Sequence, residues 1–338
     1  MTLKYAHFAL WLPVMLGGCP FEGEPKDTSG AAGTGETGSL DDTASCTASL
    51  TTVDPAEGGV GVYYRSPVTL SFDGDGSAAL IQVLDPAGAD IGMTPTWQAG
   101  NNMVVLEGGL SPSTAYTVHV ELCGVTNETH FTTSSDGSPL TVGVDELIGR
   151  TYSFALADAE ITEPAVLEMF DDTKLVTPLG FMVQNADATT LELLGGVLSR
   201  KDGVLVQTDE TDTWDFPASD FTAQPYFTTY IDSLAIVYSD TGVEKTTIQL
   251  YKFTLDGIFT PDGSAITHGH VDTLVDVRNL GPLFGLEDTP TAVCEFAADF
   301  AVYCVACPDE VESCLYTIGE DINAPWVEGL SLTPYPVE

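Results

Sequence analysis

Apolar and polar residues alternate in short stretches from about residue 46 to the end of the chain. In residues 68–72 the side chains of Val68, Leu70 and Phe72 share one face, and in residues 116–122 every second side chain is again apolar. A period of two is typical of a half-buried β-strand, because successive side chains of a strand point to opposite faces of the sheet. Gly, Pro, Asp and Asn separate the stretches, and no helical period is sustained for long. The pattern predicts an all-β protein.

A run of Ser, Asp, Gly and Pro at residues 134–139 divides these stretches into two groups. We predict a first domain at residues 46–135 and a larger antiparallel β domain at residues 140–338. The larger domain is expected to close as a barrel or to fold over as a sandwich. The strands expected in the two domains are 68–72, 80–84, 103–106, 116–122 and 130–133 in the first, and 151–154, 179–183, 190–194, 204–206, 234–238 and 247–255 in the second.

Two local features are expected in the larger domain. The alternation in residues 247–255 changes parity after Leu250, which a β-bulge near that residue would explain. Residues 279–287 are expected to form one short helix.

The first domain carries a more specific pattern. Tyr116 begins a late strand just after a corner that contains Pro112. This placement resembles the tyrosine corner of immunoglobulin-like (Ig-like) sandwiches, in which the tyrosine hydroxyl bonds to the backbone across the corner. The region also resembles the SbsA-type bacterial Ig-like domain, through four segments in the same order: 53–60, 67–72, 110–116 and 131–133. The resemblance covers residues 47 to about 135 and implies a spacer or adhesion module without catalytic residues.

The N-terminus has the layout of a secretory signal peptide: Lys4, an apolar segment from Tyr5 to Leu16, and small residues before Cys19. The segment is too short to span a bilayer, which takes about 20 apolar residues. Leu16-Gly17-Gly18-Cys19 resembles the lipobox of bacterial lipoproteins, which implies removal of residues 1–18 and acylation of Cys19. Two or three acyl chains would hold the protein firmly on a membrane. In that family an Asp after the cysteine often retains the protein at the inner membrane, so the resemblance with Pro20 at this position implies the outer membrane, with the periplasmic or surface face left open. The alternative is an ordinary signal peptide with Cys19 as a free thiol.

Residues 19–45 are rich in Gly, Ser, Thr, Asp and Glu and predict a flexible acidic linker. Its root-mean-square span is about 28 Å for a Gly-rich coil, which would lift the folded domains away from the membrane. The chain as a whole carries a formal net charge of −40. Such a charge excludes nucleic acid as a natural partner, because phosphate binding requires clustered Lys and Arg.

Seven cysteines are present, so six remain once Cys19 is acylated. An even number in an exported chain favours three disulfides. Cys46 and Cys123 would form one bridge in the first domain. The other four allow three pairings, of which we favour Cys294–Cys304 with Cys307–Cys314. A zinc site or a redox role for the Cys304-Val305-Ala306-Cys307 run is the less favoured reading.

One motif could hold a metal ion. On a strand, His268, His270 and Asp272 would share one face, a weak candidate for a metal site. The run faintly resembles the His-x-His-x-Asp sequence of metallo-β-lactamase folds, but Thr273 stands where that family has His. A strand with incidental histidines is the favoured reading. Residues 209–215 could hold calcium loosely, although a solvated acidic loop explains them better.

The sequence contains no Gly-x-Ser-x-Gly, no phosphate-binding Gly-rich loop and no His-Glu-x-x-His. The hypothesis is therefore a lipid-anchored cell-envelope protein that is not an enzyme and needs no cofactor, with a role in adhesion, recognition or structural spacing. Its partners would be the membrane, through the anchor, and an envelope protein or glycan. The alternative is an envelope hydrolase, metal-dependent or glycan-directed, with its site in the second domain.

Overall fold

The computed structural model describes residues 47–164, 177–238 and 246–335. Residues 46–338 form one compact unit. Cys19, the linker and Cys46 lie outside the described residues, so the expectations made for them stay predictions. In the described part, no helix has the length and apolar character that a membrane crossing requires.

Strands dominate the structure, and the all-β prediction with an Ig-like sandwich is confirmed. The first domain consists of two four-stranded sheets, one in the order β1-β3-β6-β5 and the other in the order β2-β8-β7-β4. All pairs are antiparallel except β2 with β8. The bounds are β1 Leu50–Asp54, β2 Gly59–Val62, β3 Val68–Phe72, β4 Leu80–Leu84, β5 Thr94–Trp97, β6 Met103–Glu107, β7 Ala115–Leu122 and β8 Val125–Thr133.

The alternation seen in the sequence builds the core of this sandwich. Strand β3 buries Val68, Leu70 and Phe72, and β7 buries Tyr116, Val118, Val120 and Leu122. The predicted tyrosine corner is present, since the backbone N–H of Ser111 donates to the Tyr116 hydroxyl oxygen at 2.8 Å. The bond ties the β6–β7 connection to the core strand that follows it.

We expect the substitution Tyr116→Phe to lower the free energy of unfolding by about 1 kcal/mol, because it removes this hydrogen bond while keeping the buried ring. Urea unfolding of the two proteins measures the difference. Tyr335→Phe, at a 42% exposed tyrosine, is the control and should change stability by less than about 0.5 kcal/mol. An unchanged midpoint in Tyr116→Phe would mean that the corner bond does not stabilise the domain.

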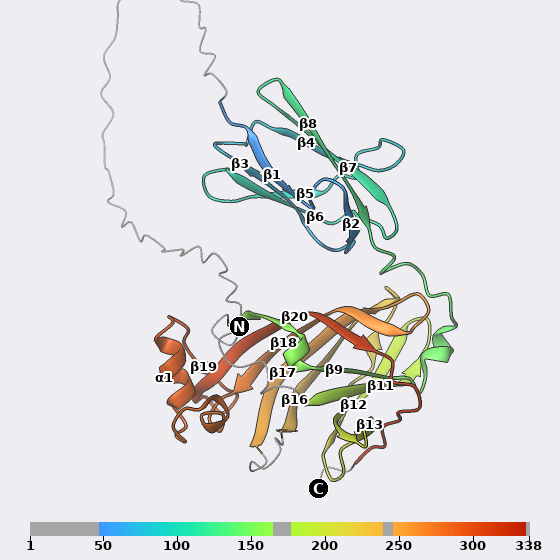
Figure 1. Cartoon of the computed structure of the whole chain (residues 1–338), viewed down its shortest axis with the longest axis vertical. Coiled ribbons are helices and arrows are strands. Elements are labelled where there is room, and N and C mark those ends of the chain that lie inside the picture. Colours follow the sequence, from blue (N-terminus) through green and yellow to red (C-terminus); the bar gives the residue numbers. More distant parts are fainter. Residues whose placement is uncertain (1–46, 165–176, 239–245, 336–338) are drawn as a thin grey trace, which may run out of the picture. The chain divides into compact units, whose positions relative to one another are not determined.

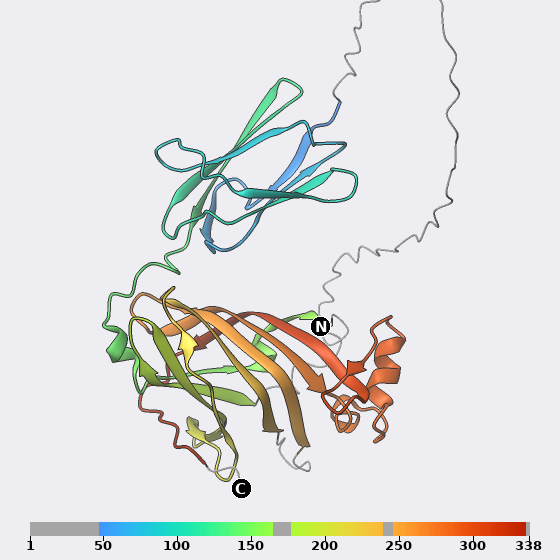
Figure 2. The ribbon, with the colours of Figure 1, turned by 180° about the vertical axis from the view of Figure 1, so that it is seen from behind.

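The second domain is built from two larger sheets (Figures 1 and 2). One has the order β10-β20-β18-β17-β16, with β19 added to β20, and the other has the order β13-β12-β11-β9, with β14 and β15 added to β12. An isolated bridge between Tyr152 and Trp326 joins the two sheets at β9 and the end of β20. The result is a half-barrel. The sequence analysis left a closed barrel and a folded-over sandwich as alternatives. The bounds are β9 Thr151–Ala155, β10 Glu160–Glu163, β11 Pro178–Ala186, β12 Thr190–Lys201, β13 Val204–Gln207, β14 Thr213–Asp215, β15 Ser219–Asp220, β16 Tyr226–Tyr238, β17 Thr246–Phe259, β18 Ala265–Asp276, β19 Val305–Ala306 and β20 Glu312–Pro325.

Aromatic side chains from both sheets fill the space between them. Phe259 of β17 is fully buried, and its ring lies 5.1–5.9 Å from the rings of Tyr152, Phe221 and Phe227. Rings at such separations attract one another beyond the area that they bury. The second domain is therefore held by one core that both sheets share.

Strand β17 contains the predicted bulge. Its register with β18 shifts between Tyr251 and Thr254, and Lys252 adopts a positive φ of 51°. The inward-facing positions change accordingly, from Ile248 and Leu250 to Phe253 and Leu255. The extra residue lets one long strand keep its apolar side chains in the core across the change of parity.

The prediction of a helix at residues 279–287 is wrong. Only a single 3₁₀ turn, Pro282–Phe284, forms there. The one α-helix among the described residues is α1, Ala292–Ala298, further along the chain. Seven residues are too few to display a helical period in the sequence.

The four C-terminal cysteines form two disulfides, Cys294–Cys304 and Cys307–Cys314. This is the pairing favoured from the sequence. The first links α1 to the residue before β19, and the second links the residue after β19 to β20. Cys123 is also disulfide-bonded. Its expected partner, Cys46, lies outside the described residues.

Candidate functional site

A pocket of about 520 Å³ lies where residues 63–66 of the first domain face the strands of the second. This volume is within the range of about 300–1,000 Å³ that small-molecule sites occupy. The pocket is lined by Tyr63, Arg65, Ser66, Glu160, Tyr226, Asp256, His268, Gly269, His270, Glu320 and Asp321. The lining includes His268 and His270, two of the three residues that the sequence offered as a candidate metal site.

A bulge in β18 sets the direction of His268. The register of β18 with β20 shifts between Ile266 and Gly269, and His268 adopts a φ of 49°, in the left-handed region. A side chain at Gly269 would place its Cβ 2.9 Å from the Cβ of Ile322, so only glycine fits beside the bulge. Bulges of this kind re-aim side chains at functional sites.

His268 is fixed by contacts on more than one side. Its ring stacks on that of Tyr63 with a centroid distance of 4.1 Å and an interplanar angle of 7°. Its Nε2 atom lies 3.0 Å from Asp136 Oδ2, and its Nδ1 atom lies 3.9 Å from Asp321 Oδ1. The imidazole therefore connects Tyr63, just after β2, and Asp136, just after β8, to strands β18 and β20 of the second domain.

His270 has a different carboxylate partner. Asp256 of β17 stands directly opposite it in the register of the sheet, with Asp256 Oδ2 3.0 Å from His270 Nδ1. Burial raises the pKa of the Asp256 carboxyl, and the bond to His270 opposes that rise. Titratable groups with shifted pKa values in a cleft are candidates for binding or chemistry.

Arg65 covers one side of Tyr226. Its guanidinium carbon lies 3.5 Å from the centroid of the Tyr226 ring, a cation–π contact, and its Nε–H donates to the Tyr64 hydroxyl oxygen at 3.0 Å. Burial raises the pKa of the neighbouring Tyr63 hydroxyl above its ordinary value. The pocket thus presents a fixed cation beside two aromatic rings.

Carboxylates dominate the rim. Glu160, the first residue of β10, is the register partner of Glu320 on β20, and Asp321 follows. Like charges directly opposite each other on neighbouring strands are unfavourable by themselves. With Arg65 as the only lysine or arginine in the lining, the pocket disfavours an anionic ligand.

The structure does not bring His268, His270 and Asp272 together as a metal site. Asp272 is absent from the pocket lining and instead accepts a hydrogen bond from the Tyr316 hydroxyl at 2.8 Å. Within residues 47–164, 177–238 and 246–335, no group of three or more His, Cys, Asp or Glu side chains could hold a metal ion. That range includes the acidic loop at residues 209–215, the candidate calcium loop.

Sequence reasoning missed most of the lining, including Tyr63, Arg65, Tyr226 and Asp256. One signal was available. The chain has only 10 Lys and Arg residues, and Arg65 is the sole one between Lys26 and Arg150. In a strongly acidic domain, a lone arginine next to two tyrosines marks a place where a specific contact is made.

The comparisons with known proteins supply no family. No protein-family model matches the chain, and no curated protein matches it. Three solved structures show weak likenesses. The crystal structure of CopC from Methylosinus trichosporium OB3b has a TM-score of 0.24 and 19% identity, covering 26% of this chain and 94% of that one. The LD transpeptidase LdtMt1 in complex with imipenem has a TM-score of 0.21 and 13% identity, covering 61% and 75%. The I-band fragment I67–I69 from titin has a TM-score of 0.21 and 9% identity, covering 68% and 60%.

Proposed function

We propose that this protein is a non-enzymatic recognition module of the bacterial cell envelope, which is anchored through Cys19 and binds a glycan in the pocket between residues 63–66 and strands β16–β18. The observation that carries the proposal is the lining of that pocket, in which aromatic rings stand beside hydrogen-bonding carboxylates. The linker and the Ig-like domain would serve as the spacer between membrane and pocket.

The chemistry of the lining favours a sugar. Aromatic rings such as those of Tyr63 and Tyr226 offer flat apolar faces, and their hydroxyls offer polar edges. Carboxylates such as Glu160 and Glu320 accept hydrogen bonds from hydroxyl groups. A sugar has apolar C–H faces and a rim of hydroxyl groups, so it can use both the aromatic faces and the carboxylates. The acidic rim selects among sugars: it favours those that are neutral or carry an amine.

The pocket is preorganised for binding. The stack of Tyr63 on His268 and the cation–π contact of Arg65 with Tyr226 fix four of the lining side chains. Side chains that are already ordered lose little conformational entropy when a ligand arrives. This supports recognition as the role of the pocket.

We expect Tyr226→Ala to weaken glycan binding at least tenfold, a change of about 1.4 kcal/mol, because it removes an aromatic face and the platform of Arg65. The matched control is Tyr230→Ala, an exposed tyrosine four residues along the same strand and outside the pocket lining. A glycan array probed with the purified full chain and both variants measures the effect. Equal loss in both variants, or no binding by any of the three proteins, would refute the proposal.

The anchor is tested separately. We expect Cys19→Ala to release the protein from membranes and to abolish incorporation of labelled palmitate, because the thiol that would be acylated is gone. Fractionation of cells that express both forms shows the change. Cys19→Ala that stays membrane-bound and labelled would contradict lipid anchoring, whatever the pocket binds.

A hydrolase remains the alternative function because one observation favours it. Asp256 has a raised pKa and lies against His270 at the edge of the pocket, which is the kind of pair that proton transfer requires. A binding module leaves its glycan intact, and a hydrolase does not.

A further inference from the structure

A second surface lies in the disulfide-containing part of the second domain, residues 292–314, here called the stapled segment. Five of the thirteen large apolar side chains that are exposed in the described part of the chain lie within residues 300–316. Four of these belong to the stapled segment: Phe300, Tyr303, Val305 and Val311, which are 44%, 72%, 43% and 49% exposed. Exposed apolar side chains that are concentrated in one short stretch of chain are candidates for an interaction site.

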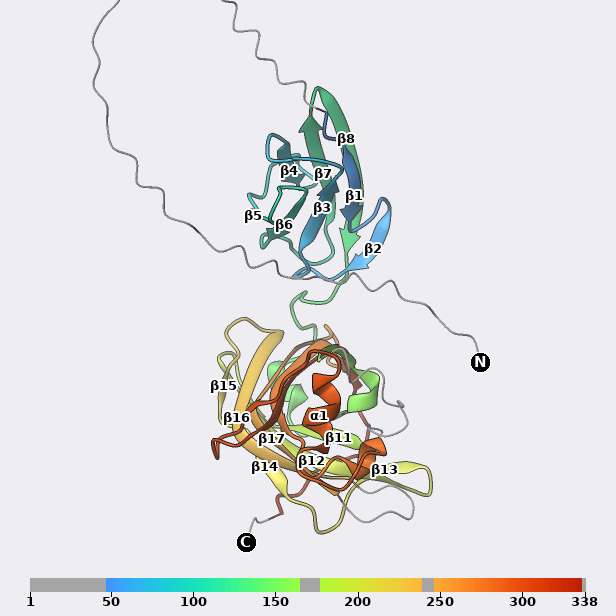
Figure 3. The ribbon, with the colours of Figure 1, turned by 90° about the vertical axis from the view of Figure 1, so that its left-hand side faces the viewer.

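The segment is held rigid. The disulfides Cys294–Cys304 and Cys307–Cys314 close it on both sides of β19. Figure 1 shows α1 and β19 beside the beginning of β20, and Figure 3 shows α1 in a view turned by 90°. The Cys307 N–H donates to the Val311 carbonyl oxygen at 2.9 Å, which shapes the turn between them. The two cross-links restrict the conformations that the segment can adopt.

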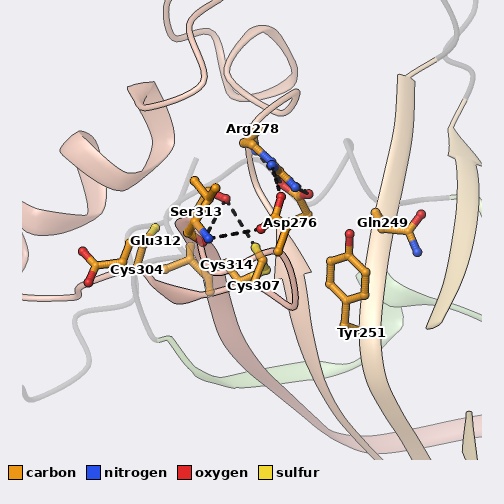
Figure 4. Close-up of a disulfide and its surroundings, with 12 residues drawn as sticks. Gln249, Tyr251, Asp276, Arg278, Cys304, Cys307, Glu312, Ser313 and Cys314 are labelled. Carbon is orange, nitrogen blue, oxygen red and sulfur yellow. Dashed lines mark hydrogen bonds and ion pairs between the residues drawn. A yellow bond between two sulfur atoms is a disulfide. The ribbon is translucent and has the colours of Figure 1, made fainter. Parts of the chain in front are cut away.

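The base of the segment is fixed by charge. Arg278 donates to both carboxylate oxygens of Asp276 through Nε and to Asp309 Oδ2 through Nη1 at 2.6 Å. Figure 4 shows Arg278 and Asp276 beside the Cys307–Cys314 bridge. Asp309 lies in the turn, so this arginine ties the turn to the end of β18.

The charges of the segment indicate its partner. Between Glu287 and Glu320 the sequence contains no lysine, arginine or histidine. Besides Asp309, the segment carries four acidic residues, all exposed: Glu295, Asp299, Glu310 and Glu312. An anionic membrane would be repelled, and so would a second copy of a chain with a net charge of −40. A basic partner would be attracted.

We infer that the stapled segment is a docking surface for a basic segment of another protein, one that places an apolar side chain against Tyr303 and Val311 and Lys or Arg against the acidic residues around them. This surface is separate from the glycan pocket and does not depend on the proposed function.

The test is selection from a random library of 12-residue peptides displayed on phage, with the full chain as the target. The expected consensus combines Lys or Arg with aromatic or aliphatic residues. A synthetic consensus peptide should bind Tyr303→Ser/Val311→Ser at least tenfold more weakly than the unmodified chain, and its affinity should fall as salt rises. Both substitutions are at exposed positions, so the fold should be kept.

The control is Val125→Ser/Tyr230→Ser, at side chains that are 58% and 44% exposed elsewhere, which should bind the peptide as the unmodified chain does. The inference is overturned if no consensus or an acidic one emerges, or if the peptide binds both double variants equally. It is also overturned if the peptide loses affinity for Tyr226→Ala instead. Finally, a dimer or a vesicle-bound form that Tyr303→Ser/Val311→Ser abolishes would assign the surface to a second copy or to a membrane.

Discussion

Phe259→Ala should lower the free energy of unfolding of the second domain by about 3–5 kcal/mol. The Phe259 ring is fully buried and lies against three other aromatic rings, contributed by Tyr152, Phe221 and Phe227. Its removal leaves a cavity at the centre of the core that both sheets share, and the surrounding rings cannot collapse into it without leaving their own positions. Denaturant unfolding followed by tryptophan fluorescence measures the loss.

The control for this change is Val204→Ala, at a side chain that is 62% exposed on β13. It should alter stability by less than about 0.5 kcal/mol. A Phe259→Ala protein that is as stable as the Val204→Ala protein would mean that the two sheets do not share one core.

Cys307→Ala/Cys314→Ala should produce the second large loss. The bridge spans a sequence separation of 7, and closure of a loop of that size stabilises by about 2.5 kcal/mol in the chain-entropy model. Both cysteines are buried, Cys314 completely, and Cys314 pairs in register with Asp276 of β18. Loss of the bridge should therefore loosen the stapled segment and the adjoining end of β20.

Hydrogen exchange locates the effect. Faster exchange is expected in residues 305–316, while the amides of the first domain keep the rates of the unmodified protein. If the denaturation midpoint and the exchange rates are both unchanged, the bridge does not hold the stapled segment in place.

The sequence predicted the strands that alternate cleanly and missed those that do not. Strand β3 buries every second residue, and its bounds in the structure are those expected. Strand β20 was not expected, because Gly319, Glu320 and Asp321 interrupt its apolar pattern. Its position is fixed by pairing with β18 and β10, which are non-local contacts that a local period does not contain.

The tyrosine corner could be predicted because its partners are close in the chain: Ser111 and Tyr116 are five residues apart. The pocket could not. His268 meets Asp136 across 132 residues, and Tyr63 is further away still. The sequence placed His268, His270 and Asp272 on one strand, but the residues that complete the pocket come from other strands and from the first domain, which only the fold brings together.

The scarcity of basic residues is the one sequence signal that indicates where these long-range contacts are made. Arg65 lies over Tyr226, Arg150 donates to the Gly263 carbonyl oxygen at 2.8 Å, and Arg278 holds Asp276 and Asp309. In a chain with 50 acidic and 10 basic residues, an arginine is surrounded by possible partners. Its position marks a contact but does not identify the partner.

One experiment decides whether the protein only binds its glycan or also cleaves it. A glycan selected on the array is incubated with excess purified full chain, and its mass and its amount bound are then measured together by mass spectrometry and calorimetry. We predict saturable binding, and we expect the glycan to be recovered unchanged after incubation with the unmodified chain and with Asp256→Asn alike. Cleavage products that grow with protein concentration and disappear in Asp256→Asn would contradict it and would make the protein a hydrolase.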